Sequence, residues 1–149
     1  PKISVSPSNH KCMADVFSKE KRSEIMSRIR AKNTGIEKTV FLYLRKRKIY
    51  FRQHYDKIPG KPDIALPSKK KAVFINGDFW HGYRFRAWKH RIPKKYWRDK
   101  IESNIARDKR RYAALKRREW KIFKVWGHDV MKRPEETCKK IEKFLKSKR

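Results

Sequence analysis

The excess of positive charge is the feature that most constrains this chain. The sequence contains 44 Lys and Arg residues against 15 Asp and Glu residues, which gives a formal net charge of +29. Repulsion between so many like charges opposes a compact state unless an anion is nearby, and nucleic acid is the commonest such anion. Hydrophobic residues still make up 38% of the 149 residues, which is enough for one core and excludes a wholly disordered basic tail. We therefore expect one folded domain that binds nucleic acid.

A membrane is the other anionic surface that such a chain could bind. No apolar run approaches the length of about 18 residues that spans a bilayer, and the first residues show no secretory signal pattern. We expect no membrane partner and a location in the cytoplasm, associated with the nucleoid. Residues 1–12 lack periodicity and contain turn formers, so we expect a disordered extension there and a single domain over 13–149.

Apolar periodicity predicts an alternation of helices and strands. Helices are expected over 18–30, 34–47 and 94–118, with a last helix that begins at Pro134. Strands are expected over 49–55 and 120–126, together with a hairpin over 63–66 and 72–75. The aromatic segment 76–93 is expected to be irregular and to lie outside the core. This order predicts an α/β fold in which helices flank a mixed central sheet.

Acidic residues are scarce, so those at constrained positions are the candidates for catalysis. Asp63 follows Pro62 at the start of a predicted strand, where a rigidly held carboxylate could bring a divalent cation to a phosphate; a turn-forming Asp is the alternative. Glu37 occupies the third helical position of a capping box that begins at Thr34, which explains it without catalysis. Asp108 falls on the apolar face of the long predicted helix, where a solvated charge is not expected.

The loop after the predicted hairpin carries Phe79 and Trp80 next to His81. Two large aromatic side chains in a loop flanked by glycines would cost free energy in water, so they are expected to stack on bases or to wedge between base pairs. An imidazole beside them could take a proton from water near neutral pH, and a structural, hydrogen-bonded histidine is the alternative.

Four short motifs follow one another in this chain with characteristic spacing: Thr34-Gly35-Ile36-Glu37, Pro59-Gly60-Lys61-Pro62-Asp63, Phe79-Trp80-His81 and Arg107-Asp108-Lys109-Arg110-Arg111. In order and spacing they resemble the very short patch repair (Vsr) mismatch endonucleases. The resemblance extends from about Met13 to Trp126 and so covers most of the chain.

The resemblance implies a restriction-endonuclease-like core and an enzyme that uses Mg²⁺ to nick one strand of duplex DNA. The implied cut lies on the 5′ side of the mismatched thymine of a T·G pair and leaves 5′-phosphate and 3′-hydroxyl ends. By similarity, Asp63 would bind magnesium with help from the main-chain carbonyl of Ile75. His81 would activate the attacking water, Asp108 would orient His81, and Glu37 would be a further acid of the site.

The expected contacts with DNA are of two kinds. The resemblance implies that Phe79, Trp80 and Trp97 wedge into the helix from the major groove and that Met26 enters from the minor groove. Basic residues of the helix 94–118, among them Lys109 and Arg110, are expected to neutralise phosphates. Double-stranded DNA is thus the expected partner of a monomeric protein, with mismatch-repair proteins as further candidates.

Two departures from the family pattern modify these expectations. Asn76 stands where many members carry a second His, and because an amide cannot act as a general acid, we expect it only to position a phosphate. The family's structural zinc needs thiolates and imidazoles, but the matching positions hold Asp78, Tyr83, Phe85 and His128. We therefore expect no structural zinc.

Two other functions remain open at this stage. One is a related nickase or restriction-type nuclease without mismatch preference, which the fold cannot separate from a mismatch enzyme. The other is a catalytically weak architectural protein that keeps only the basic surface and the wedges. The joint presence of Asp63, His81, Glu37 and Asp108 argues against this second alternative, because none of them is needed to bind an anion.

Overall fold

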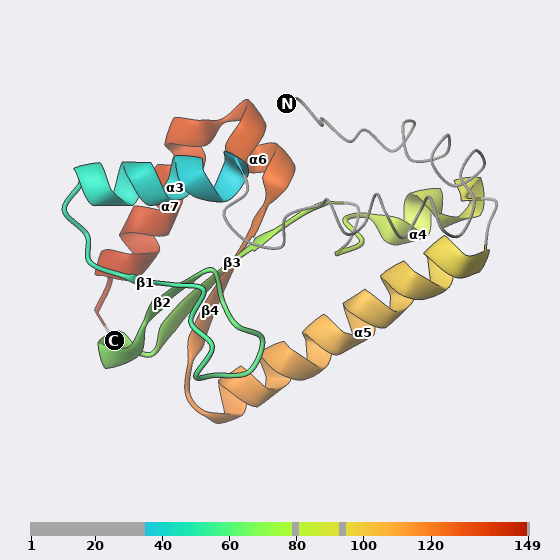
Figure 1. The fold of residues 1–149 in the computed structure, drawn as a ribbon, viewed down its shortest axis with the longest axis horizontal. Helices are drawn as coiled ribbons and strands as arrows, with labels where there is room; N and C mark the ends of the chain where they lie inside the picture. The colour runs from blue at the N-terminus through green and yellow to red at the C-terminus, as the bar shows by residue number, and fades with distance from the viewer. Residues whose placement is uncertain (1–34, 79–80, 93–94, 149) are drawn as a thin grey trace.

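The structure, a computed structural model, describes residues 35–148 except residues 79–80 and 93–94. Within these residues four strands form one sheet in the order β1-β2-β3-β4 (Figure 1). The strands are β1 (Arg52–Gln53), β2 (Ile64–Leu66), β3 (Lys71–Asn76) and β4 (Lys121–Trp126). β2 is antiparallel to β1 and β3, whereas β4 is parallel to β3, so the sheet is mixed. The predicted helix over 18–30 and the extension 1–12 lie outside the described residues.

Helices cover both faces of this sheet. Helices α3 (Gly35–Lys46), α6 (Gly127–Lys132) and α7 (Pro134–Lys146) gather on one face, and the long α5 (Lys95–Arg117) lies against the other (Figure 1). The short α4 (Phe85–Trp88) packs near the start of α5. The predicted α/β architecture, a mixed sheet flanked by helices, is confirmed. No helix in the described part of the chain is both long and apolar enough to cross a membrane.

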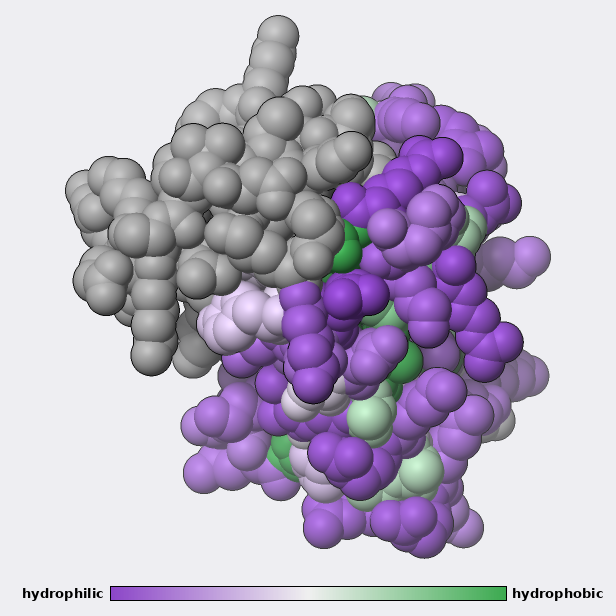
Figure 2. All heavy atoms as spheres, turned by 90° about the vertical axis from the view of Figure 1, so that its right-hand side faces the viewer, coloured by the Kyte–Doolittle hydropathy of each residue, from purple (hydrophilic) through white to green (hydrophobic). Residues whose placement is uncertain are grey.

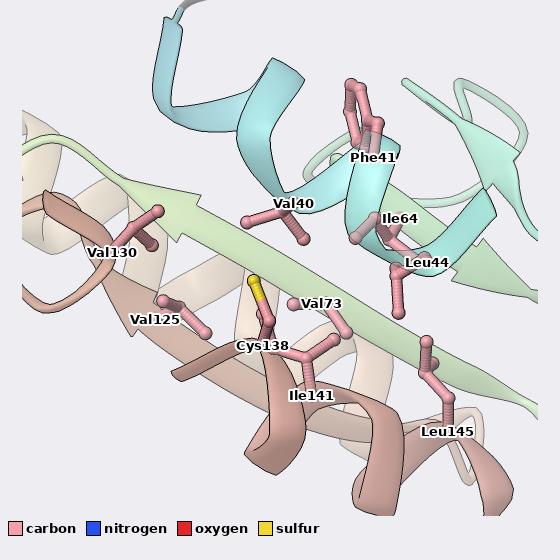
Figure 3. Close-up of a cluster of buried hydrophobic side chains, with 10 residues drawn as sticks. All are labelled: Val40, Phe41, Leu44, Ile64, Val73, Val125, Val130, Cys138, Ile141 and Leu145. Atoms are coloured by element: carbon pink, nitrogen blue, oxygen red, sulfur yellow. The ribbon is translucent and has the colours of Figure 1, made fainter. Parts of the chain in front are cut away.

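The larger core fills the space between the sheet and the helices α3, α6 and α7. Figure 3 shows side chains from these helices meeting those of β2, β3 and β4: Val40, Phe41, Leu44, Ile64, Val73, Val125, Val130, Cys138, Ile141 and Leu145. On α3 the apolar positions recur at helical spacing, which turns one face to the sheet. Each fully buried aliphatic side chain contributes about 1.5–3 kcal/mol. This packing fixes α3, and with it Glu37 one turn earlier.

A smaller core lies between the sheet and α5. Ala65 and Ala72 are paired across β2 and β3 and are fully buried, so the sheet presents only methyl groups there and α5 can approach closely. Phe74, Leu115 and Trp120 complete the layer. The C-terminal half of α5 is thereby fixed to the sheet, and the positions one and two turns before Leu115 face the end of β3.

Two sequence predictions were wrong in detail. The strand expected over 49–55 is limited to β1, because His54 adopts a positive φ of 45° that ends the extended conformation. The aromatic segment 76–93 does not lie outside the core: Phe85 and Trp88 are buried with Ile92 against the start of α5. Their rings meet edge to face at 5.3 Å, so part of this aromatic segment is structural.

Candidate active site

Glu37, His54 and Asp63 form a cluster, here called the acidic–histidine cluster, at one end of the sheet. One ligand atom from each residue lies within 4.8 Å of the others, so the group could hold a metal ion. The imidazole lies between the acids, with Nε2 3.4 Å from a Glu37 carboxylate oxygen and Nδ1 3.8 Å from Asp63 Oδ1. The three side chains come from α3, from the residue after β1 and from the residue before β2.

Backbone contacts explain why these three residues meet. The His54 N–H donates to the Asp63 carbonyl at 3.0 Å, which continues the β1–β2 pairing by one residue. The Phe41 ring, fixed in the larger core, packs edge-on against the His54 ring at 5.7 Å. The Ile75 N–H donates to Asp63 Oδ2 at 2.7 Å, so β3 orients the carboxylate. The Ile75 main chain thus lies beside Asp63, while the role of its carbonyl as a metal ligand stays a prediction.

The Asp63 carboxyl is held where its anion is disfavoured. Its side chain is only 17% exposed, and burial raises its pKa from 3.8 to about 7. The hydrogen bond from Ile75 opposes this rise in pKa, whereas the charge of Glu37 adds to it. A hard divalent cation between the two carboxylates would relieve this cost, and carboxylate oxygens are the ligands that such a cation prefers. The donor set therefore fits Mg²⁺ through Asp63 and Glu37, with the His54 nitrogen better suited to hold the acids in place.

His81 and Asp108 form a second pair, from the loop after β3 and from α5. His81 Nδ1 lies 2.6 Å from Asp108 Oδ2, and Asp108 is 9% exposed. Because the carboxylate can only accept, Nδ1 carries the proton, and Nε2 presents its lone pair as a base. The unexpected acid on the apolar face of α5 thus has a histidine as its partner.

Gly82 lets the His81 loop approach α5 this closely. Its φ is +70°, a conformation that L side chains rarely adopt, and a Cβ added there would lie 2.8 Å from Ile105 Cγ1. Ile105 precedes Asp108 by three residues on the same face of the helix. A side chain at position 82 would push the loop away from α5 and stretch the His81–Asp108 contact.

Asn76, at the end of β3, also reaches α5. Its Nδ2 donates to the Tyr112 hydroxyl at 3.1 Å. Sequence reasoning singled out Asn76 but not Tyr112, which counted only as an apolar member of the helix face. It also missed His54, which stood inside a stretch interpreted as strand. The sequence did contain one indication of its role, because a polar histidine stands close to the end of the predicted strand.

Three of the four positions that match the family's zinc ligands, Asp78, Tyr83 and His128, lie close together. Asp78 Oδ2 lies 2.8 Å from His128 Nδ1, and its Oδ1 accepts the His128 main-chain N–H at 3.3 Å. The Tyr83 ring lies 4.5 Å from the His128 ring. Phe85 instead belongs to a group of buried side chains, here called the α4–α5 cluster, made up of Phe85, Trp88, Ile92, Trp97 and Ile101. Asp78 and His128 thus link the loop after β3 to the start of α6, while the zinc content of the protein stays a prediction.

The expected DNA contacts fall in different surroundings. Lys109 and Arg110 are exposed on α5 directly after Asp108. On the face drawn in Figure 2, hydrophilic side chains cover most of the surface outside the grey residues. The net charge of +29 is what suits the chain to a polyanionic partner. Trp97 is 3% exposed and packs with Ile101 in the α4–α5 cluster. Met26, Phe79 and Trp80 lie outside the described residues, so their roles stay predictions.

Comparisons with known proteins agree with this picture. The family model described as DNA mismatch endonuclease Vsr matches residues 14–87. The type II nicking enzyme V.XorIIP of Xanthomonas oryzae is 42% identical over 117 residues, which cover 76% of this chain and 85% of that protein. The type II nicking enzyme V.HpaIIP of Haemophilus parainfluenzae is 35% identical over 135 residues, or 88% of this chain and 95% of its own. The DNA mismatch endonuclease Vsr of Escherichia coli is 32% identical over 115 residues, or 76% of this chain and 74% of its own.

The fold and these relatives define the class of protein, a DNA endonuclease with a restriction-endonuclease-like core. The chain belongs to the Vsr family. The resemblance, the fold class and the enzyme class predicted from the sequence are thereby confirmed, whereas the role of each site residue stays a prediction.

Proposed function

We propose that this protein is a Mg²⁺-dependent endonuclease that nicks one strand of duplex DNA at T·G mismatches. The observation that carries the proposal is the acidic–histidine cluster, in which two carboxylates from distant parts of the chain share a partly desolvated site. Carboxylates repel the phosphates of DNA, so in a chain of net charge +29 these two acids do not help to bind DNA directly. They serve well for holding a cation against a phosphate.

The residues of the chain divide the work of hydrolysis. Asp63 and Glu37 would hold the metal ion, with the Ile75 carbonyl as an additional ligand. Bound Mg²⁺ supplies positive charge that offsets the negative charge developing on the phosphate. His81 takes a proton from water at Nε2, and the water oxygen forms a bond to phosphorus while the bond from phosphorus to the 3′ oxygen breaks. The 3′ oxygen leaves with the electron pair of that bond and takes a proton from solvent, which gives the 3′-hydroxyl end. Asp108 stabilises the imidazolium that results, because it already accepts the Nδ1 proton.

Recognition of the mismatch would depend on how easily a base pair opens. Unstacking a base step costs a few kcal/mol of free energy, and a T·G mismatch lowers part of this cost. Aromatic side chains that insert between bases would therefore bind more favourably where a base pair opens easily. Phe79 and Trp80 directly precede His81 in the sequence. Insertion of their side chains into DNA would therefore also affect the position of His81, the proposed general base. Trp97, for which the resemblance also implies insertion, is buried in the α4–α5 cluster, so it would reach DNA only after that cluster opens.

A second candidate function is strand nicking without mismatch preference. Two of the relatives described above are named as type II nicking enzymes, and their names do not mention mismatches. The same cluster and the same His81–Asp108 pair would serve this reaction equally well. The two candidates therefore differ only in substrate, and the test is a choice between duplexes.

The test uses end-labelled duplexes that contain a T·G pair, another mismatch, uracil or no lesion, each with Mg²⁺ or with EDTA. We expect one strand of the T·G duplex to be cut on the 5′ side of the mismatched thymine, and only with Mg²⁺. Equal cutting of the matched duplex would favour the second candidate, and no cutting of any duplex would reject both.

A matched pair of histidine variants adds the mechanism to this test. His81→Ala is expected to slow cutting by roughly 10² to 10⁴, the usual contribution of a positioned general base. His90→Ala removes an exposed imidazole of the neighbouring turn Lys89–Arg91 and is expected to leave the rate unchanged. Equal rates for the two variants would remove His81 from the mechanism.

A further inference from the structure

Asn76, which is buried, and Tyr112, which is half-buried, form a polar pair that the proposed mechanism does not use. The Asn76 amide donates to the Tyr112 hydroxyl at 3.1 Å, and Asn76 is 5% exposed. A hydrogen bond of this kind contributes little net stability, and two packed apolar side chains can stabilise as much. Stability alone therefore does not explain an amide and a hydroxyl at this position.

The pair lies between the two parts of the candidate active site. Asn76 follows Ile75, whose N–H holds Asp63, and the alternation along β3 turns Asn76 to the α5 side of the sheet. Tyr112 stands four residues after Asp108 on the same face of α5, and Asp108 holds His81. The Asn76–Tyr112 contact thus connects the strand that orients Asp63 to the helix that orients His81.

The surroundings of Tyr112 fix both its ring and its hydroxyl group. The Phe74 ring packs edge-on against it at 5.0 Å, and Lys124 Nζ lies 4.7 Å from its ring centroid. Burial raises the pKa of Tyr112 to about 12; the Asn76 hydrogen bond opposes this, and the charges of Asp108 and Asp63 add to it. The hydroxyl group therefore lies in the field of both carboxylates and keeps its proton.

The contact with Tyr112 selects one orientation of the Asn76 amide. Because Nδ2 can only donate, the Tyr112 oxygen accepts its N–H at 3.1 Å. The amide is then held with its NH₂ group toward Tyr112. An amide that turned over would present its carbonyl oxygen in the place of the NH₂ group, and that oxygen would repel a phosphate.

We propose that Tyr112 is a positioning residue for strand cleavage, which acts by fixing the Asn76 amide so that its second N–H donates to a non-bridging oxygen of the scissile phosphate. This inference rests on the proposed nuclease function and adds to it a neutral donor that neither the metal ligands nor the base provides. Tyr112 itself touches no reacting atom in this scheme, and its effect reaches the phosphate only through Asn76.

The test is a double-mutant cycle of wild type, Asn76→Ala, Tyr112→Phe and the double variant. For each protein we would measure the single-turnover nicking rate with Mg²⁺ on the duplex that wild type cuts fastest, the Kd for that duplex in EDTA, and the midpoint of urea unfolding. Tyr43→Phe is the matched control, because it removes a tyrosine hydrogen bond of 2.9 Å to Glu142 between α3 and α7.

We expect Tyr112→Phe to slow nicking about 10-fold, the effect of one misaligned hydrogen bond to a charged group, while the Kd stays within about twofold. The double variant should be no slower than Asn76→Ala, since Tyr112 acts only through Asn76. Tyr43→Phe should lower the urea midpoint with an unchanged nicking rate.

The results that would overturn the inference are distinct from a failure of the proposed function. If wild type nicks but Tyr112→Phe nicks equally fast, or if the two losses multiply in the double variant, Tyr112 does not position Asn76 for cleavage. If wild type nicks no duplex under any condition, the nuclease function fails and this inference fails with it.

Discussion

Replacing Asp63 by Asn should make the metal-free protein more stable at neutral pH. The variant keeps an oxygen that accepts the Ile75 N–H, seen in the wild type at 2.7 Å, but it removes the buried negative charge. Burial raises the pKa of Asp63 to about 7, so the folded wild-type protein retains this proton over a range in which the unfolded chain has lost it. The stability that the protonated carboxyl contributes is complete below about pH 4 and is lost as the pH rises through about 7.

The size of the effect follows from the two pKa values. Each pH unit between 3.8 in the unfolded chain and about 7 in the folded protein corresponds to about 1.4 kcal/mol. Asp63→Asn should therefore exceed wild type by a few kcal/mol in unfolding free energy above pH 7, with a ceiling of about 4 kcal/mol. Near pH 4 the two proteins should be equally stable. Other acid-induced effects are common to both and cancel in the difference.

Urea denaturation of both proteins in EDTA from pH 4 to pH 8 measures this difference. Added Mg²⁺ should then stabilise wild type and not Asp63→Asn, because only the carboxylate provides a strong ligand. A stability difference that does not change with pH would refute the view that Asp63 is a strained, desolvated acid. Equal stabilisation of both proteins by Mg²⁺ would place the metal elsewhere.

The remaining predictions concern the parts that support the site. Asp108→Asn should slow nicking by roughly 10-fold to 100-fold at unchanged DNA affinity, because an amide cannot stabilise the His81 imidazolium. Rapid-quench kinetics measure this rate, and a wild-type rate would show that Asp108 does not assist His81 in catalysis. Gly82→Ala should lower the unfolding free energy by about 1–3 kcal/mol, because the added Cβ would meet Ile105 and the residue has a positive φ. Gly35→Ala is the control, since a Cβ added there has no neighbouring atom within 4 Å, and it should not destabilise the protein. Equal urea curves for the two variants would contradict this prediction. Elemental analysis should find far less than one zinc per chain and a chelator should leave the Tm unchanged, because two of the four matching positions, Tyr83 and Phe85, are not ordinary zinc ligands. Stoichiometric zinc would mean that other residues are its ligands.

Much of the fold could be predicted from local pattern. The hairpin of β2 and β3 was predicted from two short apolar runs around a turn, and α5 from an apolar stripe that repeats over more than five turns. Asp108 was notable because it interrupts that stripe, and its contact with His81 gives the physical reason. Periodicity detects a charged residue on an apolar helix face because it depends only on local spacing and not on which segments pack together in the fold.

The rest depended on contacts between segments that are distant in sequence. His54 joins the site only because a positive φ ends β1 beside Asp63 and because Phe41 packs against its ring. Phe85 and Trp88 were expected on the surface, since their segment has no periodicity, yet the start of α5 covers them. The Tyr112 hydroxyl acquires a partner only once β3 lies against α5. Local sequence patterns cannot specify such contacts between distant segments.

Nicking and binding by Asp63→Ala test the central claim most directly. The variant and wild type would be compared on one end-labelled T·G duplex, with single-turnover cutting in Mg²⁺ and duplex affinity in EDTA measured side by side. The metal-dependent site proposed here predicts that Asp63→Ala binds at least as tightly as wild type, because a negative charge near the phosphate is gone, and leaves both strands intact. Cutting by Asp63→Ala at the wild-type rate would contradict the assignment of this cluster as the active site.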